Sequence, residues 1–297
     1  MSIERELSWS SSRVDIFSRC QLEYYFTYYL SHGGWEKGAD KRVRDCYLLK
    51  HTKNRYAWMG DLVHQTLEHF LNQCRKGERL SREAVIAFGD QQMRREFRES
   101  RDQQYRLYPN RCVGLVEHEN NMPVTDEQWK RIHENLVTCL GNFFYTDFYK
   151  TRISETLKPI FKIERLEHFF LDNIKVYAKP DVAFKEEDRL HIIDWKTGAA
   201  HDEHEFQLYY YVLFGVHKLG FNAEQIDADI IYLKDNTLKQ VEIRPEYLEG
   251  AKDHLNRTFD KMRLFDEAVR QGLQEAELPV SSSKNTCCLC RFQKLCG

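Results

Sequence analysis

An acidic and a basic residue lie two positions apart at the end of an apolar run, in the segment LHIIDWKTG at residues 190–198. If this run is a β-strand, Asp194 and Lys196 share one face, because side chains alternate between the two faces. Asp181 follows Pro180 in KPDVAF, at a distance that lets a hairpin bring it beside Asp194. Two neighbouring carboxylates repel unless a cation separates them, and Mg²⁺ prefers oxygen ligands. The pattern predicts a divalent metal site at which Lys196 positions or activates a water.

Two further segments place polar side chains on one face of a predicted helix. His64 and Glu68 are four residues apart in GDLVHQTLE, and Gln207 and Tyr211 have the same spacing in QLYYY. His64 would add an imidazole ligand that suits Mn²⁺ as well as Mg²⁺, and Gln207 and Tyr211 would orient a substrate or Lys196. Taken singly, His64 also fits a core or surface histidine, and Tyr211 fits an aromatic core stripe.

The cysteines form a second group of residues able to do chemistry. The chain has nine, and four of them, Cys287, Cys288, Cys290 and Cys296, lie in its last eleven residues. Clustered cysteines in a cytosolic protein more often bind metal than form disulfides. The C-x-x-C spacing of Cys287 and Cys290 suits zinc as well as iron. The scattered cysteines are expected to be small buried hydrophobes.

The predicted elements change in type along the chain. The first half is expected to be helical, and a capping box of Thr125 and Gln128 begins a long helix there. Strands follow from about residue 160, with helices between and after them. The predicted helices are 10–30, 57–77, 81–106, 125–150, 205–220 and 245–272, and the predicted strands are 160–171, 174–184, 189–198 and a hairpin over 228–243.

This order predicts an α/β fold, with a mixed sheet at about residues 160–245 flanked by helices. The predicted domains are the N-terminal helices (1–77), a helical insertion (78–158), the core with its last helix (159–280) and a cysteine-rich tail (281–297).

Composition limits the class of protein without naming a partner. The 297 residues are 42% hydrophobic and 30% charged, as in an ordinary globular protein. The net charge of -2 means that any nucleic-acid site must be a local patch. The N-terminus does not resemble a secretory signal, and no apolar run of about 18 residues occurs. We therefore expect a cytoplasmic protein with no membrane partner.

Taken together, P-D at 180–181 and D-W-K at 194–196 resemble the PD-(D/E)xK nuclease superfamily, whose fold is restriction-endonuclease-like. The GDLVHQTLE and QLYYY segments are similar to the G-x-x-x-H-x-x-L-E and Q-x-x-x-Y motifs of its RecB-like branch. The resemblance implies metal-dependent DNA cleavage, as an exonuclease on single-stranded ends, with DNA that has single-stranded or duplex ends as the partner. It assigns catalysis to Asp181, Asp194, Lys196, Gln207 and Glu68, Mg²⁺ or Mn²⁺ binding to His64, Asp181, Asp194 and the carbonyl of Trp195, and substrate binding to Tyr211.

The cysteines resemble those of iron–sulfur nucleases of the AddB and CRISPR-associated RecB-like types. These nucleases hold a [4Fe–4S] cluster with one cysteine before the nuclease core and three after it. The resemblance implies a structural cluster, which would tie the two chain ends together. Its ligands would be Cys20, Cys287, Cys290 and Cys296. Zinc remains the alternative, and Cys288 or Cys46 would be the replacement ligand if one of the four is not used.

Several alternatives stay open at this stage. The likeness implies a role in DNA repair, recombination, or CRISPR or antiphage defence, with a helicase, an integrase or another such protein as partner. The alternative is a catalytically silent nucleic-acid- or partner-binding module, and RNA is an alternative substrate. Ala178 stands where the family usually has glycine, and this small-for-small change should be tolerated.

Two groups of side chains have both a functional and an ordinary explanation. Acids interleave with five arginines in the predicted insertion, which favours a solvated face over phosphate contacts. These arginines are Arg94, Arg95, Arg98, Arg101 and Arg106. The aromatic residues of the first helix suit core packing better than stacking on unpaired bases. These are Tyr24, Tyr25, Phe26, Tyr28 and Tyr29.

Overall fold

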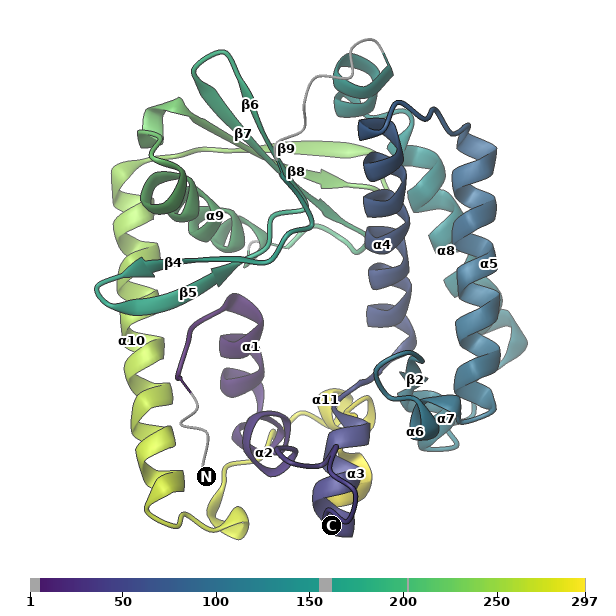
Figure 1. The fold of residues 1–297 in the computed structure, drawn as a ribbon, viewed down its shortest axis with the longest axis vertical. Helices are drawn as coiled ribbons and strands as arrows, with labels where there is room; N and C mark the ends of the chain where they lie inside the picture. The colour runs from purple at the N-terminus through teal and green to yellow at the C-terminus, as the bar shows by residue number, and fades with distance from the viewer. Residues whose placement is uncertain (1–5, 155–161, 202, 297) are drawn as a thin grey trace. The chain divides into compact units, whose positions relative to one another are not determined.

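The computed structural model describes residues 6–154, 162–201 and 203–296 (Figure 1). The chain divides into two compact units, each built from three separate stretches. The sheet unit comprises Met1–Val14, His64–Val85 and Thr138–Gln271, and the helical unit comprises Asp15–Val63, Ile86–Val137 and Gly272–Gly297. The domain boundaries after residues 77, 158 and 280 stay predictions about the sequence, since each unit combines stretches that lie far apart along it.

The sheet unit contains a five-stranded mixed sheet in the order β3-β6-β7-β8-β9. The pair β7–β8 is parallel and the other pairs are antiparallel. Strands β4 and β5 form a separate hairpin. The strands are β3 (Lys162–Ile163), β4 (Glu167–Leu171), β5 (Ile174–Ala178), β6 (Val182–Glu186), β7 (Arg189–Lys196), β8 (Ile226–Tyr232) and β9 (Thr237–Val241). The predicted fold class, a mixed sheet flanked by helices, is confirmed.

Two of the predicted strands are each interrupted, which corrects the sequence interpretation. The stretch 160–171, of which residues 160 and 161 lie outside the described residues, contains β3 and β4, and 174–184 contains β5 and the start of β6. Glu164 ends β3 because its φ of 46° is left-handed and incompatible with an extended strand. Pro180 separates β5 from β6, because proline has no N–H for a strand ladder.

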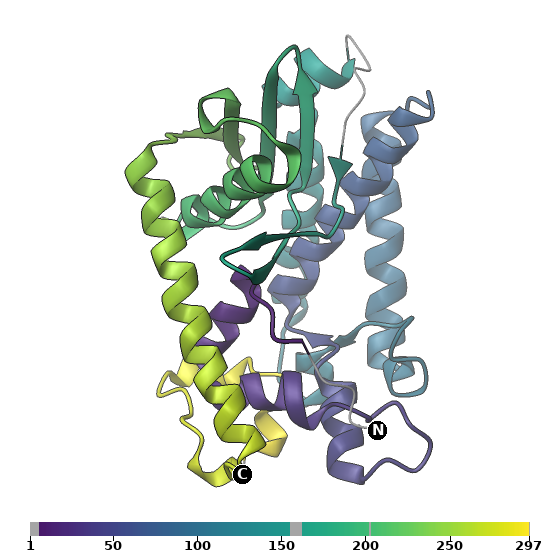
Figure 2. The same cartoon turned by 60° about the vertical axis from the view of Figure 1, so that its left-hand side comes forward.

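Helix α9 (Glu203–Leu219) connects the parallel strands β7 and β8, which require such a crossover. It packs closely on the sheet at Gly215. A Cβ atom there would lie 2.7 Å from Cδ1 of Ile226 and 2.9 Å from Cδ2 of Leu190. The even-numbered residues of β7 therefore face α9, since Leu190 belongs to that set. Helix α10 (Pro245–Arg270) packs in turn against α9 (Figure 2).

The opposite face of the sheet is covered by aromatic residues. The ring centroid of Trp195 lies 5.8 Å from that of Phe143 and 6.3 Å from that of Phe148. Burial on both faces explains why the central strands are almost continuously apolar. A buried polar group on β7 therefore destabilises the folded state unless it has a hydrogen-bond or ion-pair partner.

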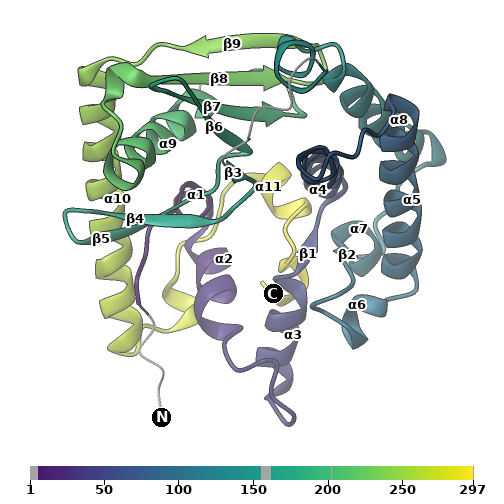
Figure 3. The same cartoon turned by 45° about the horizontal axis from the view of Figure 1, so that its top comes forward.

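Helices dominate the remaining described residues, and α1, α4, α5 and α8 each run from one unit into the other. Figure 3 shows the same ribbon with its top turned toward the viewer. The helices are α1 (Ser11–Arg19), α2 (Gln21–Tyr25), α3 (Lys41–Leu49), α4 (Arg55–Arg75), α5 (Arg82–Arg101), α6 (Gln104–Leu107), α7 (Val116–Glu119), α8 (Asp126–Phe143) and α11 (Lys284–Cys288), with short strands β1 (Thr52–Lys53) and β2 (Gly114–Leu115). Short π or 3₁₀ turns occupy Phe26–Leu30, Tyr149–Ser154, Ala223–Gln225, Glu275–Glu277 and Gln293–Leu295.

The predicted first helix is wrong in one informative respect, because it breaks at Cys20. That residue has an extended backbone with φ of -162°, and its sulfur accepts a hydrogen bond from the Glu23 main-chain nitrogen at 3.4 Å. Cys20 thus caps α2, as serine commonly does. The capping box of Thr125 and Gln128 is present at the start of α8. Among the described residues, we find no helix with the length and apolar character required to span a bilayer.

Asp229 on β8 generates a stability prediction. Burial and the neighbouring charge of Asp227 raise the pKa of Asp229 to about 6 from 3.8. The folded state therefore holds this proton more tightly than the unfolded state, so ionisation weakens the fold as the pH rises from about 4 to about 6. We expect Asp229→Asn to stabilise the protein at pH 7.5 by roughly 1 kcal/mol after discounting for solvent screening. Thermal unfolding should show a higher Tm that converges on the wild-type value near pH 4.

Asp227 provides a matched control of opposite sign on the same strand. Its hydrogen bond from Arg189 lowers its pKa, so its ionised form is stabilising in the folded state. Asp227→Asn should lower the Tm at pH 7.5. An Asp229→Asn variant that is no more stable than wild type at that pH would contradict the assignment.

Candidate active site

The β6–β7 hairpin brings the two predicted aspartates together. Val182 pairs with Ile193 in the antiparallel register, so the adjacent Asp181 and Asp194 come opposite each other. Both carboxylates are buried, with 3% and 2% of the residue exposed. The main-chain nitrogen of Trp195 donates a hydrogen bond to Oδ2 of Asp181 at 2.7 Å. The hairpin that the sequence spacing predicts is therefore present. Asp194 lies on the face of the sheet that α9 covers.

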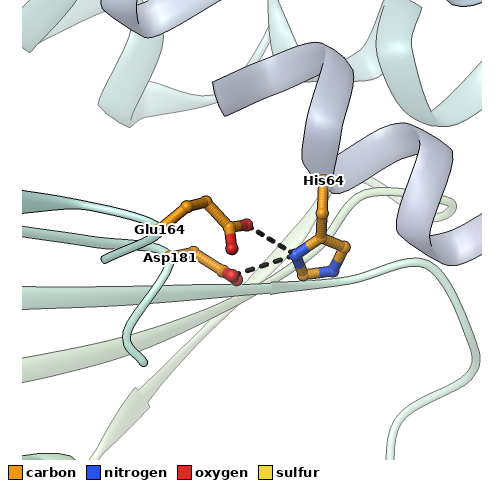
Figure 4. A group of neighbouring side chains, drawn as sticks. All are labelled: His64, Glu164 and Asp181. Atoms are coloured by element: carbon orange, nitrogen blue, oxygen red, sulfur yellow. Dashed lines mark hydrogen bonds and ion pairs between the residues drawn. The ribbon is translucent and has the colours of Figure 1, made fainter. Parts of the chain in front are cut away.

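A histidine from α4 joins this pair from outside the sheet. Nδ1 of His64 lies 2.9 Å from Oδ1 of Asp181 and 2.9 Å from Oε1 of Glu164 (Figure 4). The three ligand atoms all lie within 4.8 Å of one another. One imidazole nitrogen and two carboxylate oxygens therefore converge on one point.

Glu164 is the member of this group that sequence reasoning missed. It directly follows β3, and its main-chain N–H donates to the Asp181 carbonyl at 2.9 Å. This bond holds the left-handed backbone of Glu164, a conformation that costs an ordinary residue about 1 kcal/mol or more. The available signal was an acidic residue directly after the apolar Ile163. Reading residues 160–171 as one strand hid the pairing that brings it beside Asp181.

The close approach of these charges shifts the pKa values of His64, Glu164 and Asp181. Burial and the charge of Asp194 raise the pKa of Asp181 to about 7, although His64 opposes this shift. Burial also favours a neutral Glu164, but hydrogen bonds from His64, Asp181 and Lys179 hold its pKa at about 2. Burial disfavours a charged His64, and the two carboxylates outweigh it, so the pKa of His64 is well above its usual value. All three pKa shifts therefore have one cause, the confinement of two buried carboxylates around one imidazole.

Glu68 and Lys179 lie at the border of the site. Nζ of Lys179 forms an ion pair with Oε2 of Glu164 at 2.5 Å. Burial and the charge of Glu164 raise the pKa of Glu68, while Lys179 lowers it. Glu68, one helical turn after His64, is not part of the three-residue ligand group. The catalytic role that the resemblance assigns to Glu68 stays a prediction.

Lys196 is held at its head by two groups. Nζ lies 2.6 Å from Oδ2 of Asp194 in an ion pair and donates to Oε1 of Gln207 at 2.6 Å. The contact with Oδ2 of Asp194 is an ion pair without hydrogen-bond alignment, and this oxygen accepts no other hydrogen bond among the described residues. It therefore keeps lone-pair capacity for a cation, although Asp194 stands outside the tight group around His64.

The two aromatic residues of the predicted site, Tyr211 and Trp195, are both buried. Tyr211 was assigned to the substrate, but its hydroxyl accepts from Nε2 of Gln207 at 2.6 Å and donates to the Lys179 carbonyl at 3.0 Å. Its ring is almost fully buried. The side chain of Trp195 is fully buried as well, so only its main chain is available for the metal role that the sequence assigns to it.

The predicted cluster cysteines lie in the helical unit. The sulfur of Cys290 accepts a hydrogen bond from the Phe292 nitrogen at 3.4 Å, as that of Cys20 does from Glu23. Burial, with smaller contributions from Glu23, Cys296 and Cys20, raises the pKa of Cys290 to about 12. Burial and the charges of Cys20 and Cys287 also raise the pKa of Cys296. Cys290 and Cys296 therefore each lie within electrostatic range of Cys20, and Cys296 also lies within range of Cys287.

Apolar and main-chain contacts join the two ends of the chain around these cysteines. Phe26 and Phe292 are completely buried, with ring centroids 5.3 Å apart. The Leu22 nitrogen donates to the Pro279 carbonyl at 3.3 Å. Cys46 is also buried nearby, and Cys296 contributes to raising its pKa. Cys46 therefore stays a possible replacement ligand.

The donor set in the sheet unit suits a hard divalent cation. Carboxylate oxygens are the preferred ligands of Mg²⁺, and one imidazole nitrogen extends the preference to Mn²⁺. A cation at this point would relieve the repulsion that raises the pKa of Asp181. The residues present therefore fit such an ion, and Asp181, Glu164 and His64 would hold it.

Comparison with known families agrees with this geometry. The family model of the PD-(D/E)XK nuclease superfamily matches residues 8–297. The chain belongs to this superfamily. A comparison with curated proteins finds no match. Members of the PD-(D/E)XK superfamily are phosphodiesterases that typically use Mg²⁺ or Mn²⁺. A candidate site for a divalent metal ion in this chain agrees with that chemistry.

We predict that Glu164→Gln weakens Mn²⁺ binding by about ten- to hundredfold, because it removes one negative charge and one ligand oxygen. Isothermal titration calorimetry on the full chain measures this affinity directly. Glu187→Gln is the matched control, since Glu187 is exposed in the β6–β7 turn of the same unit. Equal Mn²⁺ affinities in wild type and Glu164→Gln would remove Glu164 from the ligand set.

Proposed function

We propose that this PD-(D/E)XK protein is a metal-dependent deoxyribonuclease of the RecB-like branch, acting as an exonuclease on single-stranded DNA ends. The observation that carries the proposal is the convergence of His64, Glu164 and Asp181 beside the Asp194–Lys196 pair. The RecB-like motifs support the branch, because His64, Gln207 and Lys196 all belong to this one network.

The reaction is the hydrolysis of a phosphodiester, in which water attacks phosphorus and the bond to the leaving oxygen breaks. A bound Mg²⁺ or Mn²⁺ would lower the pKa of a coordinated water and stabilise the charge on the phosphate. Asp181, Glu164 and His64 would hold that ion, and Asp194 would offer it a further oxygen. Lys196 donates hydrogen bonds to the water or the phosphate, with its ammonium group fixed by Asp194.

Gln207 and Tyr211 act through Lys196 in this proposal. The hydrogen bonds run in one direction, from Lys196 to Gln207, from Gln207 to Tyr211 and from Tyr211 to the Lys179 carbonyl. Each donor fixes the orientation of the next group, so the amide of Gln207 can present only its oxygen to Lys196. We therefore assign both residues to positioning the lysine. Tyr211 reaches a substrate only if this chain of bonds opens.

We propose in addition that Cys20, Cys287, Cys290 and Cys296 hold a structural [4Fe–4S] cluster. Hydrogen bonds to cluster sulfurs are common, and Cys20 and Cys290 each accept one. Zinc ligands would be closer together, because Zn–S bonds of about 2.3 Å place sulfurs about 3.8 Å apart. In the described part of the chain, no three cysteine sulfurs lie within 4.8 Å of one another. Thiolates that bind four different irons stand farther apart than the ligands of one zinc ion, so iron and zinc analysis of the purified protein distinguishes the two.

The alternative is a catalytically silent module that binds nucleic acid or a partner protein in a helicase or defence complex. The complete set of acids and lysine favours an enzyme over this alternative. A DNA cleavage assay distinguishes an enzyme from a silent module. A parallel digest of RNA tests whether the substrate is DNA or RNA.

Lys196→Ala is expected to reduce Mg²⁺- or Mn²⁺-dependent degradation of single-stranded DNA by at least about hundredfold, because the water loses its positioning group. Gel analysis of end-labelled oligonucleotides measures the rate and distinguishes removal of terminal nucleotides from internal cuts. Lys185→Ala, which removes an exposed lysine from the neighbouring strand β6, is the matched control. Wild-type protein that cleaves no DNA with either metal, or equal cleavage by Lys196→Ala, would refute the catalytic proposal.

Anaerobically purified protein should be brown and contain about four iron atoms per chain. Cys290→Ser should lose the colour and most of the iron, whereas Cys112→Ser, a cysteine outside the group, should retain both. Parallel Cys288→Ser and Cys46→Ser variants test the two replacement ligands by the same iron analysis. A colourless wild-type protein with stoichiometric zinc would exclude the cluster.

A further inference from the structure

A cavity of about 430 Å³ lies within the helical unit, lined by described residues of α4, α5 and α8. Its volume is in the range of small-molecule sites. The described residues that line it include three aromatic rings and four basic side chains but no acid. They are Trp58, Met93, Arg94, Phe97, Arg98, Trp129, Lys130, Ile132 and His133.

The floor of the cavity is apolar and fixed. Trp58 is 2% exposed, and its indole N–H donates to Oε2 of Glu96 at 2.7 Å. Met93 and Ile132 are buried as well. Because the polar atom of Trp58 already has its partner, this ring offers the cavity only apolar surface.

Two further rings form a wall that reaches solvent. Phe97 and Trp129 are partly exposed and meet edge to face, with centroids 5.1 Å apart and planes at 83°. This contact fixes both rings relative to each other. A flat ligand entering the cavity therefore meets a preformed aromatic surface.

Of the basic side chains on the rim, only Arg98 has no acidic partner among the described residues. Lys130 pairs with Glu134 at 3.7 Å. Arg94 and His133 share one carboxylate, that of Asp90, at 2.8 Å and 2.7 Å. Nε of Arg98 donates to the Arg94 carbonyl at 3.1 Å. No carboxylate pairs with Arg98 in the part of the chain that the structure describes. Its guanidinium is therefore available to an anion at the edge of the cavity.

This arrangement divides the arginines that the sequence analysis assigned to a solvated face. Arg95, Arg101 and Arg106 pair with acids, namely Glu99 at 3.7 Å, Asp102 at 3.0 Å and Glu119 at 2.6 Å. Their pairing agrees with that interpretation. Arg94 and Arg98 differ, because they line an aromatic cavity.

We infer that this cavity binds single-stranded DNA, by accepting one unstacked base against Phe97 and Trp129 while Arg98 contacts an adjacent phosphate. The inference deepens the proposed function, on which it rests, since the bound strand is the substrate of the nuclease. Aromatic stacking beside a cationic groove is how proteins hold unpaired strands without reading their sequence. The absence of acids among the described lining residues favours an anionic ligand over a neutral or basic one, and the aromatic wall favours an anion that carries flat bases over an acidic peptide.

The test measures binding of a fluorescein-labelled oligothymidylate to the full chain carrying Lys196→Ala, without divalent metal. Fluorescence anisotropy should show that Trp129→Ala weakens binding about five- to hundredfold, from the loss of one stacked base. Trp129→Phe should retain most of the affinity. Trp35→Ala is the matched control, since Trp35 is 49% exposed in the same unit but does not line the cavity.

The salt dependence of the same binding tests the phosphate contact. Arg98→Ala should reduce the slope of log K against log salt by about 0.7, the value for one phosphate of a single strand. Arg131→Ala is the control, because Arg131 is exposed on α8 and pairs with Glu127 at 3.6 Å. An unchanged slope in Arg98→Ala would remove the phosphate contact from the inference.

The outcomes separate this inference from the proposed nuclease activity. Oligonucleotide affinity that is unchanged in Trp129→Ala, while wild-type protein degrades DNA, overturns the cavity and leaves the nuclease intact. Loss of affinity in Trp129→Ala supports the cavity even if the wild type cleaves nothing. A further outcome is that thymidine monophosphate binds in a way that requires Trp129 while Trp129→Ala leaves the oligonucleotide affinity unchanged. That result would make the cavity a site for free nucleotides and refute the inference.

Discussion

Three buried carboxylates in close proximity are the constraint on which the rest of the sheet unit depends. Glu164, Asp181 and Asp194 each have less than a tenth of their surface exposed. A low-dielectric environment makes their mutual repulsion strong, and burial alone would neutralise them. The fold keeps them together by placing His64 between the first two and Lys196 against the third. These cationic side chains reduce the repulsion among the carboxylates, and a divalent cation bound by the same oxygens would reduce it further.

The same constraint explains why the supporting elements are rigid. Asp181 and Asp194 lie on adjacent strands of a sheet that is covered on both faces, so neither carboxylate can turn out into water. Gly215 lets α9 approach β7 closely, and this approach brings Gln207 within 2.6 Å of Lys196. The position of the lysine head therefore depends on helix packing about two turns away. Such dependence is expected of a site that must hold its groups to within a fraction of an ångström.

The sequence predicts the parts of the site that are set by local periodicity. The spacing of Asp181 and Asp194 determines a hairpin, and the four-residue spacing of Gln207 and Tyr211 determines a shared helical face, and both are present in the structure. Glu164 could not be found in this way, because its place depends on a left-handed residue and a two-residue strand that pairs with β6. Neither feature has a periodic pattern. The break at Cys20 is similar, since helical periodicity continues through it.

The helical unit shows how a nearly neutral chain can still present a cationic surface. The net charge is -2. Arg94, Arg95 and Arg101 are neutralised by acids on α5 or directly after it. Arg98 has no carboxylate partner among the described residues, and the net charge does not reveal this difference. Composition therefore cannot distinguish a solvated helix face from the rim of a binding cavity, because both contain the same residues in the same order. Only the partners of each guanidinium separate the two, and these depend on where α8 places Trp129 and Lys130 relative to α5. Local pairing of charge, rather than its total, thus decides where a polyanion can bind.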